Sequence, residues 1–185
     1  MGAALIVFGV TFAQCMNRVE PDYSVILSIG KTVPSAAVEE ISSYLEGFGT
    51  DQNDDGEVYV QIIDVSVSET AGNPQLVQGQ RTKLMAELQT GNALLFLTDN
   101  GQFEYLDGEI GLFQKLDFLT AREGKAFNWN GTAFEKAINK DSFFPEDLYL
   151  SLRAVKGSTA EKLDKNTAAR ETAAKALLKK LAEAK

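Results

Sequence analysis

The sequence predicts an α/β domain with a mostly parallel central sheet, helices that flank the sheet, and a C-terminal helix. Three largely continuous apolar segments, 23–30, 57–67 and 93–98, have the length and composition of buried strands. Two segments with helical character separate them, and connections of that length join parallel strands through right-handed crossovers. A chain of 185 residues is long enough to bury one sizeable core.

The composition excludes several kinds of chemistry. The chain has no histidine, which removes the commonest general base and the usual zinc ligand. Its one cysteine, Cys15, precedes the domain, so residues 17–185 contain no cysteine nucleophile. Residues 161–185 hold seven basic and four acidic side chains, whereas the other 160 residues hold eleven and twenty-two. Because such an acidic body repels phosphate backbones, we expect no nucleic-acid partner.

Four segments follow one another along the chain. They are an apolar leader or membrane anchor (1–16), a polar connector (17–22), the α/β domain (23–157) and an amphipathic C-terminal helix (158–185). As a helix, residues 2–16 would span about 22 Å, less than the ~30 Å hydrocarbon core of a bilayer. We therefore expect export or anchoring, with the domain outside the cytoplasm and either membrane-anchored or secreted. A lipid-modified Cys15 and a buried N-terminal strand or helix are the alternatives.

Residues 34–49 predict the first helix. Pro34 suits the first helical position, because an N–H there would have no partner within the helix. Apolar residues then recur at helical spacing, at Val38, Ile41, Leu45 and Phe48. Gly47 and Gly49 are natural helix ends.

An acidic turn follows this helix. Residues 51–56 place oxygen-bearing side chains at positions 1, 3 and 5 of a calcium loop and glycine at position 6, so they resemble the first half of EF-hand and dockerin loops. The candidate calcium ligands are the side chains of Asp51, Asn53 and Asp55 and the carbonyl of Glu57. Position 12 is Ile62 instead of a bidentate glutamate. A solvated turn is the alternative to a calcium site.

The second and third apolar segments enclose a second helix. Residues 57–67 are largely apolar on both faces, which predicts a strand well inside the sheet. Asn73 and Pro74 suit a helix N-cap and first helical position, and Gly91 ends the helix. The side chains expected to face inward are Val77, Leu84, Met85 and Leu88. The third strand, 93–98, leads into an Asp-Asn-Gly turn.

Shorter patterns predict the remaining elements. Residues 102–119 predict a short helix or a hairpin at the sheet edge, and 121–130 predict a polar loop around the only tryptophan. Residues 147–155 alternate like a strand, so we expect a return strand, with an antiparallel position at the edge as one option. The C-terminal segment has an apolar stripe formed by Ala174, Leu177, Leu178 and Leu181. It predicts a helix that docks on the sheet or, alternatively, meets a membrane or a partner.

The three strand ends indicate where a ligand would bind. In parallel α/β sheets, ligands occupy the crevice beyond the carboxyl ends of the strands. The candidate ligand-binding residues at those ends are Lys31, Thr32, Ser66, Thr98, Asp99 and Asn100. They offer charge and hydrogen bonds to a solute, and a loop or capping role is the alternative for each.

Residues 82–117 resemble a segment of bacterial extracellular solute-binding proteins, the receptor components of ABC importers. In that family a helix with a small-residue and glycine end leads into an apolar strand, a polar turn, an aromatic segment and a Leu-Asp pair. The matching positions are Thr90-Gly91, Leu94–Leu97, Asp99-Asn100-Gly101, Phe103, Tyr105 and Leu116-Asp117. The resemblance extends over residues 23–120. It implies a single solute-binding-protein-like lobe, because members have two lobes and this chain has the length of one.

The chain also resembles small membrane-tethered proteins of unknown function from Gram-positive bacteria. They share the hydrophobic leader, a Pro-Asp-Tyr start to the first strand and the D-x-N-x-D-G turn. We therefore expect an extracytoplasmic, membrane-tethered, non-catalytic binding or accessory module for a small-molecule solute. A structural or scaffolding partner in a membrane complex is the alternative. A hydrolase would need a carboxylate pair or a lysine base, and no spacing singles out such a pair.

Overall fold

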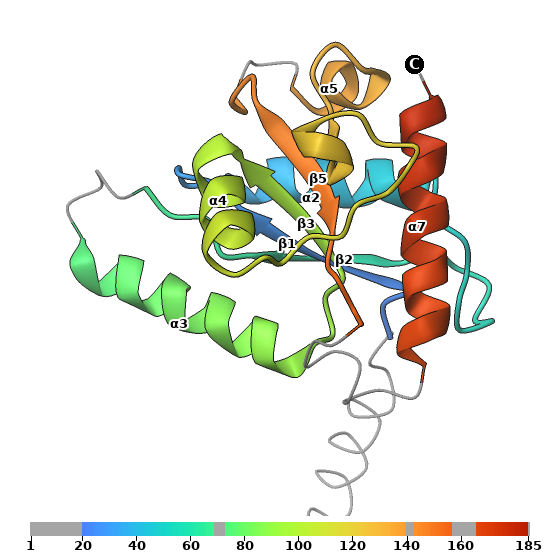
Figure 1. Cartoon of the computed structure of the whole chain (residues 1–185), viewed down its shortest axis with the longest axis horizontal. Coiled ribbons are helices and arrows are strands. Elements are labelled where there is room, and N and C mark those ends of the chain that lie inside the picture. Colours follow the sequence, from blue (N-terminus) through green and yellow to red (C-terminus); the bar gives the residue numbers. More distant parts are fainter. Residues whose placement is uncertain (1–19, 69–72, 140–142, 157–165, 185) are drawn as a thin grey trace, which may run out of the picture.

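The computed structural model describes residues 20–68, 73–139, 143–156 and 166–184. Its centre is a five-stranded sheet with the order β2-β1-β3-β5-β4 and with helices on both faces (Figure 1). The strands are β1 (Tyr23–Ser28), β2 (Val60–Asp64), β3 (Leu95–Asp99), β4 (Ala126–Asn128) and β5 (Leu148–Leu152). β1 pairs in parallel with β2 and β3, whereas β5 pairs antiparallel with β3 and β4.

The parallel half of the sheet confirms the three strands that the apolar segments predict. All six residues of β1 are buried, as expected for a strand with a neighbour on each side and cover on both faces. Val25 lies opposite Ile62 in β2 and opposite Leu95 in β3. The chain passes from β1 to β2 and then to β3, on the other side of β1. The strand order therefore reverses between β1 and β3.

The other half makes the sheet mixed, so a mostly parallel sheet is not confirmed. Two of the four strand pairings are antiparallel. β5 lies between β3 and β4 instead of at the edge, and all five of its residues are buried. β4 takes the edge, within the segment 121–130 for which the sequence predicts a loop. Three residues are too few to form a periodic pattern, which is why the sequence does not reveal this strand.

β2 is shorter and more exposed than the sequence predicts. It spans five residues and lies at the edge of the sheet, so the prediction of a strand well inside the sheet is wrong. Side chains of the flanking helices occupy part of its free edge. Glu46 Oε1 accepts the Val60 N–H at 3.2 Å, and Lys83 Nζ donates to the Asp64 carbonyl at 2.9 Å. These contacts satisfy backbone groups that a neighbouring strand would otherwise bind.

Three helices contribute to the core on one face of the sheet. They are α2 (Ser35–Glu46), α5 (Ala133–Ile138) and α7 (Thr167–Glu183). Their buried side chains share one core with Val25, Leu27 and Leu97 of the sheet. The predicted stripe of α7 is buried in that core, at Ala174, Leu177, Leu178 and Leu181. Docking of the C-terminal helix is therefore confirmed.

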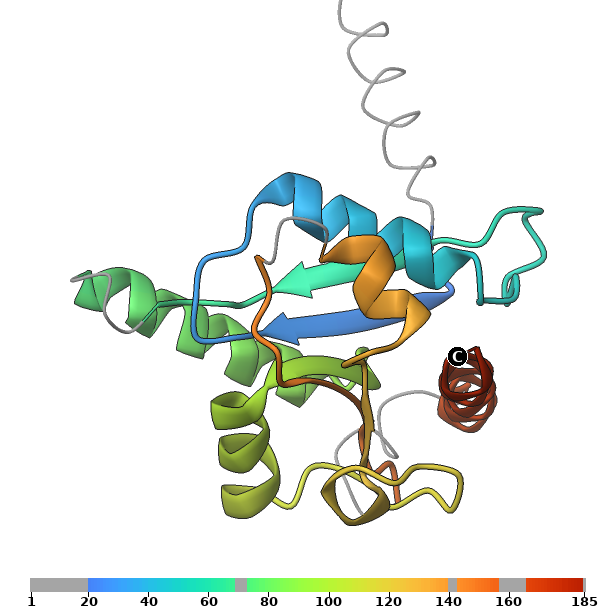
Figure 2. The same cartoon turned by 90° about the horizontal axis from the view of Figure 1, so that it is seen from above.

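The opposite face carries three helical segments. They are α3 (Pro74–Thr90), α4 (Asn100–Glu104) and the π-helical turn η2 (Tyr105–Glu109). Figure 2 shows α2 and α4 on opposite sides of β1. The Asn73 side chain caps α3, because its Oδ1 accepts the Leu76 N–H at 3.2 Å, and Gly91 ends the helix with a φ of 68°. α4 and η2 supply the short helix that the sequence predicts after the third strand, but α4 packs on the interior strands β3 and β5 instead of at the sheet edge.

α3 rests on the sheet through its second half. Its buried residues are Leu84 and Leu88. Val77 is half-buried and Met85 is 39% exposed, so the expected inward position of Met85 is wrong. The helix extends past the sheet at its amino end (Figure 1), where its first turns have no strand beneath them.

Some predictions concern residues outside the described part of the chain. The leader (1–16) and the start of the C-terminal helix at Ser158 are among them. Within the described ranges, no helix combines the length and the apolar character that crossing a membrane requires.

Candidate functional site

A cleft of about 490 Å³ opens at the carboxyl ends of β1, β2 and β3. Its floor is formed by residues 28–30 and by Val65 and Val67, which end or follow the first two strands. One wall is α3, with Gln80, Arg81, Leu84 and Met85. The other wall is the end of β3 with α4 and η2, at Asp99, Gly101, Gln102 and Tyr105. The cleft therefore lies beside the point where the strand order reverses, which is the usual ligand position in open α/β sheets.

Asp99 forms one border of the cleft and joins the ends of β1 and β3. Its Oδ2 accepts the Gly30 N–H at 2.5 Å, and its Oδ1 accepts the Gln102 N–H at 2.9 Å. The second bond caps the amino end of α4. A Cβ at Gly30 would lie 3.2 Å from Asp99 Oδ2, so glycine permits this close approach.

Two hydroxyl side chains lie on adjacent strands at the same end of the sheet. Ser28 of β1 and Thr98 of β3 are register partners. Ser28 Oγ donates to Gln102 Oε1 at 3.2 Å. Thr98 is fully buried, and its Oγ1 has no hydrogen-bond partner among the described residues. Because an unsatisfied buried hydroxyl costs about 1–3 kcal/mol, Thr98 lowers the stability of the fold beside the cleft.

Arg122 braces the α4 wall. Its Nη1 donates to Glu104 Oε1 at 2.6 Å, and its guanidinium carbon lies 5.2 Å from the Phe103 ring centre and 4.5 Å from that of Tyr149. The hydrogen bond from Nη2 to the Tyr149 hydroxyl is the largest influence on the pKa of Arg122 and raises it, and the charge of Glu104 adds to this effect. Charge and aromatic packing therefore fix α4 to the rest of the fold.

The α3 wall is anchored near its carboxyl end. Lys83 donates to the Asp64 carbonyl, as noted above for β2, and Arg153 Nη2 donates to the Leu88 carbonyl at 2.9 Å. Arg153 is 4% exposed, and burial lowers its pKa. Earlier in the helix, a Cβ at Gly79 would meet no heavy atom within 4 Å. The half of α3 that begins at Pro74 therefore has less support from the core than α4 has.

Three of the six candidate ligand residues lie in or beside the cleft. Asp99 lines it directly. Thr98 is buried one residue earlier in β3. Ser66 is buried between two lining valines, where its Oγ accepts the Ile29 N–H at 3.2 Å and donates to the Leu27 carbonyl at 3.3 Å. Its hydroxyl therefore joins β1 to the segment after β2 instead of facing a ligand.

The other three candidates do not line the cleft. Lys31 Nζ lies 4.4 Å from the centre of the Phe143 ring, as a cation–π contact. Thr32 and Asn100 are exposed. The structure therefore does not bring Lys31 and Asp99 together as the two charged groups of one site.

Sequence reasoning missed most of the two helical walls. Gln80, Arg81, Gln102 and Tyr105 line the cleft although none of them directly follows a strand. Gln102 could have been predicted from the sequence, because it lies in the first turn of the helix that follows β3. The residues of α3 carry no such signal, since their position depends on where the whole helix lies.

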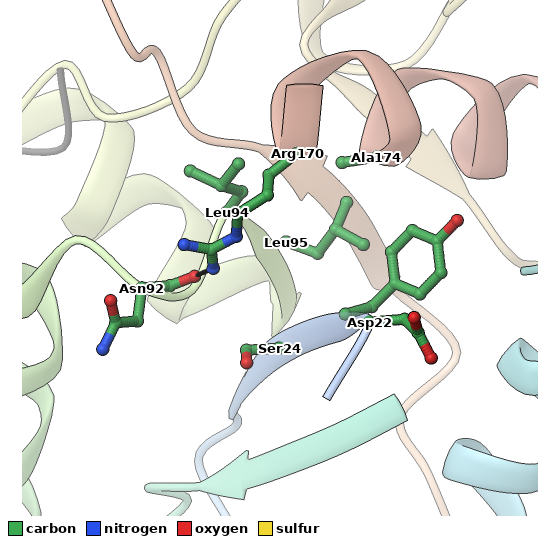
Figure 3. Close-up of a pocket in the computed structure, with 8 residues that line it drawn as sticks. Asp22, Ser24, Asn92, Leu94, Leu95, Arg170 and Ala174 are labelled. Atoms are coloured by element: carbon green, nitrogen blue, oxygen red, sulfur yellow. Dashed lines mark hydrogen bonds between the residues drawn. The ribbon is translucent and has the colours of Figure 1, made fainter. Parts of the chain in front are cut away.

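A second, much smaller hollow lies at the amino ends of β1 and β3, next to α7 (Figure 3). Its volume is about 10 Å³, which is the space that one water molecule needs. Arg170 extends from α7 and donates to the Asn92 carbonyl across it (Figure 3). The hollow is therefore too small for an organic ligand.

The acidic loop that contains the four candidate calcium ligands is held by its own side chains. Asp51 Oδ2 accepts the Gly56 N–H at 2.8 Å, and its Oδ1 accepts two further N–H groups. These backbone hydrogen bonds, that of Gly56 first, hold the pKa of Asp51 below its usual range. Asn53 Oδ1 accepts the Asp55 N–H, and Asp55 Oδ1 accepts that of Glu57, each at 3.0 Å. In the described part of the chain no three acidic, histidine or cysteine side chains gather to hold a metal, and calcium binding stays a prediction.

No known protein family, curated protein sequence or solved structure matches this chain. Its function is therefore argued from the geometry of the cleft.

Proposed function

We propose that this protein is a non-catalytic binding module that holds a small organic solute in the cleft between α3 and α4. One observation carries the proposal. A cleft of about 490 Å³ lies at the carboxyl ends of three parallel strands, where the strand order reverses. Small-molecule sites commonly have volumes of roughly 300–1,000 Å³, and open α/β sheets bind their ligands at this point.

The walls support the same proposal. Two of the few large apolar side chains that are well exposed, Met85 and Tyr105, both line the cleft, one on each wall. Ser28 and Gln102 add polar groups to the same lining. Ligand sites typically combine such apolar surface with a few polar groups that orient the ligand.

The alternative, a scaffolding partner without a solute site, has less support. The apolar stripe of α7, the surface most suited to a partner, is buried in the core. The apolar surface that the described residues leave accessible at Met85 and Tyr105 belongs to the cleft.

We also propose that the module acts outside the cytoplasm, exported or tethered by its apolar leader. The support is the sequence of residues 2–16, which is apolar and uncharged. Fractionation of bacteria that express the full chain should place it in the membrane or the medium, open to added protease. A variant without residues 2–16 should stay in the cytoplasm. Recovery of the full chain from the cytoplasm alone would refute export.

A cleft-blocking variant tests the binding site. Gly101 lines the cleft, and a Cβ there would have only an ordinary contact, 3.7 Å from Asp99 Oδ1. Gly101→Leu should therefore fill the cleft without a clash, and leucine also favours the helix by up to about 1 kcal/mol over glycine. Gly79→Leu is the matched control, because it makes the same change in a helix, in open space.

The measurement is saturation-transfer NMR on the full chain with a library of small aromatic and aliphatic fragments. We expect bound fragments with the wild type and with Gly79→Leu, and loss of those signals with Gly101→Leu. Equal binding by both variants would place the site elsewhere, and no binding to the wild type would refute a solute site.

A further inference from the structure

The charged side chains that line the cleft have no net formal charge. Arg81 on α3 and Asp99 at the end of β3 are its only charged side chains among the described residues, and their formal charges cancel. The Asp99 carboxylate is also engaged on both oxygens, by the N–H groups of Gly30 and Gln102. The whole chain carries a formal charge of −8, so its long-range field disfavours the approach of anions. Arg81 and Asp99 both already have partners within the protein, so neither is a free counter-charge for an anion or a cation.

Its uncharged polar groups are ready to form hydrogen bonds. Gln102 Oε1 accepts from Ser28 Oγ, which leaves the Gln102 Nε2 group to donate. The side chains of Gln80 and Tyr105 form no hydrogen bond within the part of the chain that the structure describes, and both line the cleft. Two amides and a phenol thus present both donors and acceptors to a ligand.

Its apolar groups form the two facing walls. Met85 is 39% exposed and Tyr105 is 44% exposed, although both side chains gain free energy from being covered. A thioether and a phenol ring both pack well against a flat aromatic face. A ligand that covers both would remove this apolar surface from water.

We infer that the cleft takes an uncharged amphiphilic molecule, with a flat apolar face between Met85 and Tyr105 and amide or hydroxyl groups on Gln80 and Gln102. This inference rests on the proposed function. A charged ligand would have to leave water for a partly apolar cleft, and that transfer is unfavourable unless the charge finds a partner of opposite sign. Asp99 is not such a partner, because both of its carboxylate oxygens already accept backbone N–H groups.

Three probes of one size and one ring separate the charge classes: benzamide, benzoate and benzylammonium. Binding to the full chain is measured at neutral pH and millimolar probe concentration by chemical-shift titration. We expect benzamide to bind at least tenfold more tightly than either charged probe. Gly101→Leu should abolish its binding, which locates the probe in the cleft.

A charge variant provides the second measurement. Gln102→Glu keeps the size of the side chain and its ability to accept from Ser28, but adds a negative charge. It should weaken benzamide binding severalfold and bring the affinity for benzylammonium up to or above that for benzamide. Circular dichroism checks that the variant is folded.

The outcomes separate the inference from the proposed function. Tighter binding of benzoate or benzylammonium than of benzamide by the wild type would overturn the inference and leave a solute-binding cleft intact. Binding of none of the three, while other fragments of the library bind, would overturn the inference alone, and binding of no fragment at all would overturn both. If Gln102→Glu still prefers benzamide over benzylammonium as the wild type does, Gln102 does not contact the probe, and the inference as stated is contradicted.

Discussion

Single polar side chains at the strand ends decide how the cleft is held. The Asp99 carboxylate accepts the N–H groups of Gly30 and Gln102. The Ser66 hydroxyl forms hydrogen bonds with the chain at β1, and the Ser28 hydroxyl donates to the Gln102 side chain. Thr98, the register partner of Ser28, has no such bond within the described residues. A hydroxyl with hydrogen bonds and a hydroxyl without them, at the same end of the sheet, therefore have opposite effects on stability.

Replacement of Asp99 should destabilise the fold. Asp99→Ala leaves two backbone N–H groups without their charged acceptor and removes the cap of α4, so the free energy of unfolding should fall by about 1–3 kcal/mol. Urea denaturation measures this change. The adjacent Asn100→Ala is the control, because Asn100 is exposed and should change stability by less than about 0.5 kcal/mol. Equal effects at the two positions would show that Asp99 does not join β1 to β3.

The two buried hydroxyls should respond in opposite directions. Thr98→Val removes an unsatisfied hydroxyl at nearly constant volume, so stability should rise by up to about 1 kcal/mol. Ser66→Ala removes a hydroxyl that both donates and accepts, so stability should fall by about 1–3 kcal/mol. Urea denaturation of both variants decides, and a loss of stability in Thr98→Val would mean that its hydroxyl has a partner.

At the scale of elements, the two walls of the cleft differ in support. α4 is fixed by the ion pair and the aromatic contacts of Arg122. α3 has its buried side chains, Leu84 and Leu88, in its second half and projects past the sheet at its amino end (Figure 1). Closure of the cleft on a ligand would therefore be carried by α3.

Hydrogen exchange should show this difference within one helix. Local opening costs least where few apolar side chains are buried, so amides of residues 78–82 should exchange faster than those of 84–90. Mass spectrometry of peptides from the exchanged full chain measures both segments. Equal protection along the helix would contradict the unequal support that the structure shows.

The acidic loop is the element on which the calcium prediction is tested. A ligand that binds only the folded state must raise the melting temperature, so millimolar calcium should do so, with magnesium as the control. Asp55→Asn keeps the acceptor for the Glu57 N–H but removes a charge from a proposed ligand, and should reduce the rise. Glu57→Gln removes a charge from a side chain that is not a ligand and should preserve it. No rise in the wild type would refute calcium binding.

The contribution of Asp51, in the same loop, to the stability of the fold depends on pH. The pKa of Asp51 is lowered in the folded state, chiefly by the Gly56 N–H. Its contribution to stability is therefore complete above the ordinary carboxyl pKa and is lost as the pH falls through the lowered value. Carboxyl ¹³C shifts of Asp51, followed by NMR from neutral to acid pH, should show a midpoint below that of an unstructured aspartate.

For the molecule as a whole, the sequence predicted the elements that local rules control. Three apolar segments became parallel strands, Asn73 and Gly91 set the ends of α3, and the stripe of α7 docked. The elements that it missed depend on distant partners. β4 is a three-residue strand that exists because β5 lies beside it, and β2 is an edge strand although its apolar pattern suits the interior.

For the candidate site, too, the sequence predicted the part that follows from the strand ends and missed the part that depends on the position of a whole helix. The strand ends located the cleft, because the connection lengths fix which ends meet, and Asp99 was among the residues named. Lys31 was not brought in, since its side chain turns to Phe143. Gln80, Arg81 and Met85 line the cleft because of where α3 lies beside the strand ends, and no local sequence pattern encodes that position.

The insertion of β5 between β3 and β4 sets the order in which the sheet is completed during synthesis. Until Leu152 has left the ribosome, β3 lacks one neighbour and β4 has nothing to pair with. A nascent chain that stops earlier exposes an unpaired, leucine-rich border, which is prone to aggregate unless a chaperone or a translocation channel shields it. Completion of the described sheet therefore waits for β5, the last of its strands along the chain.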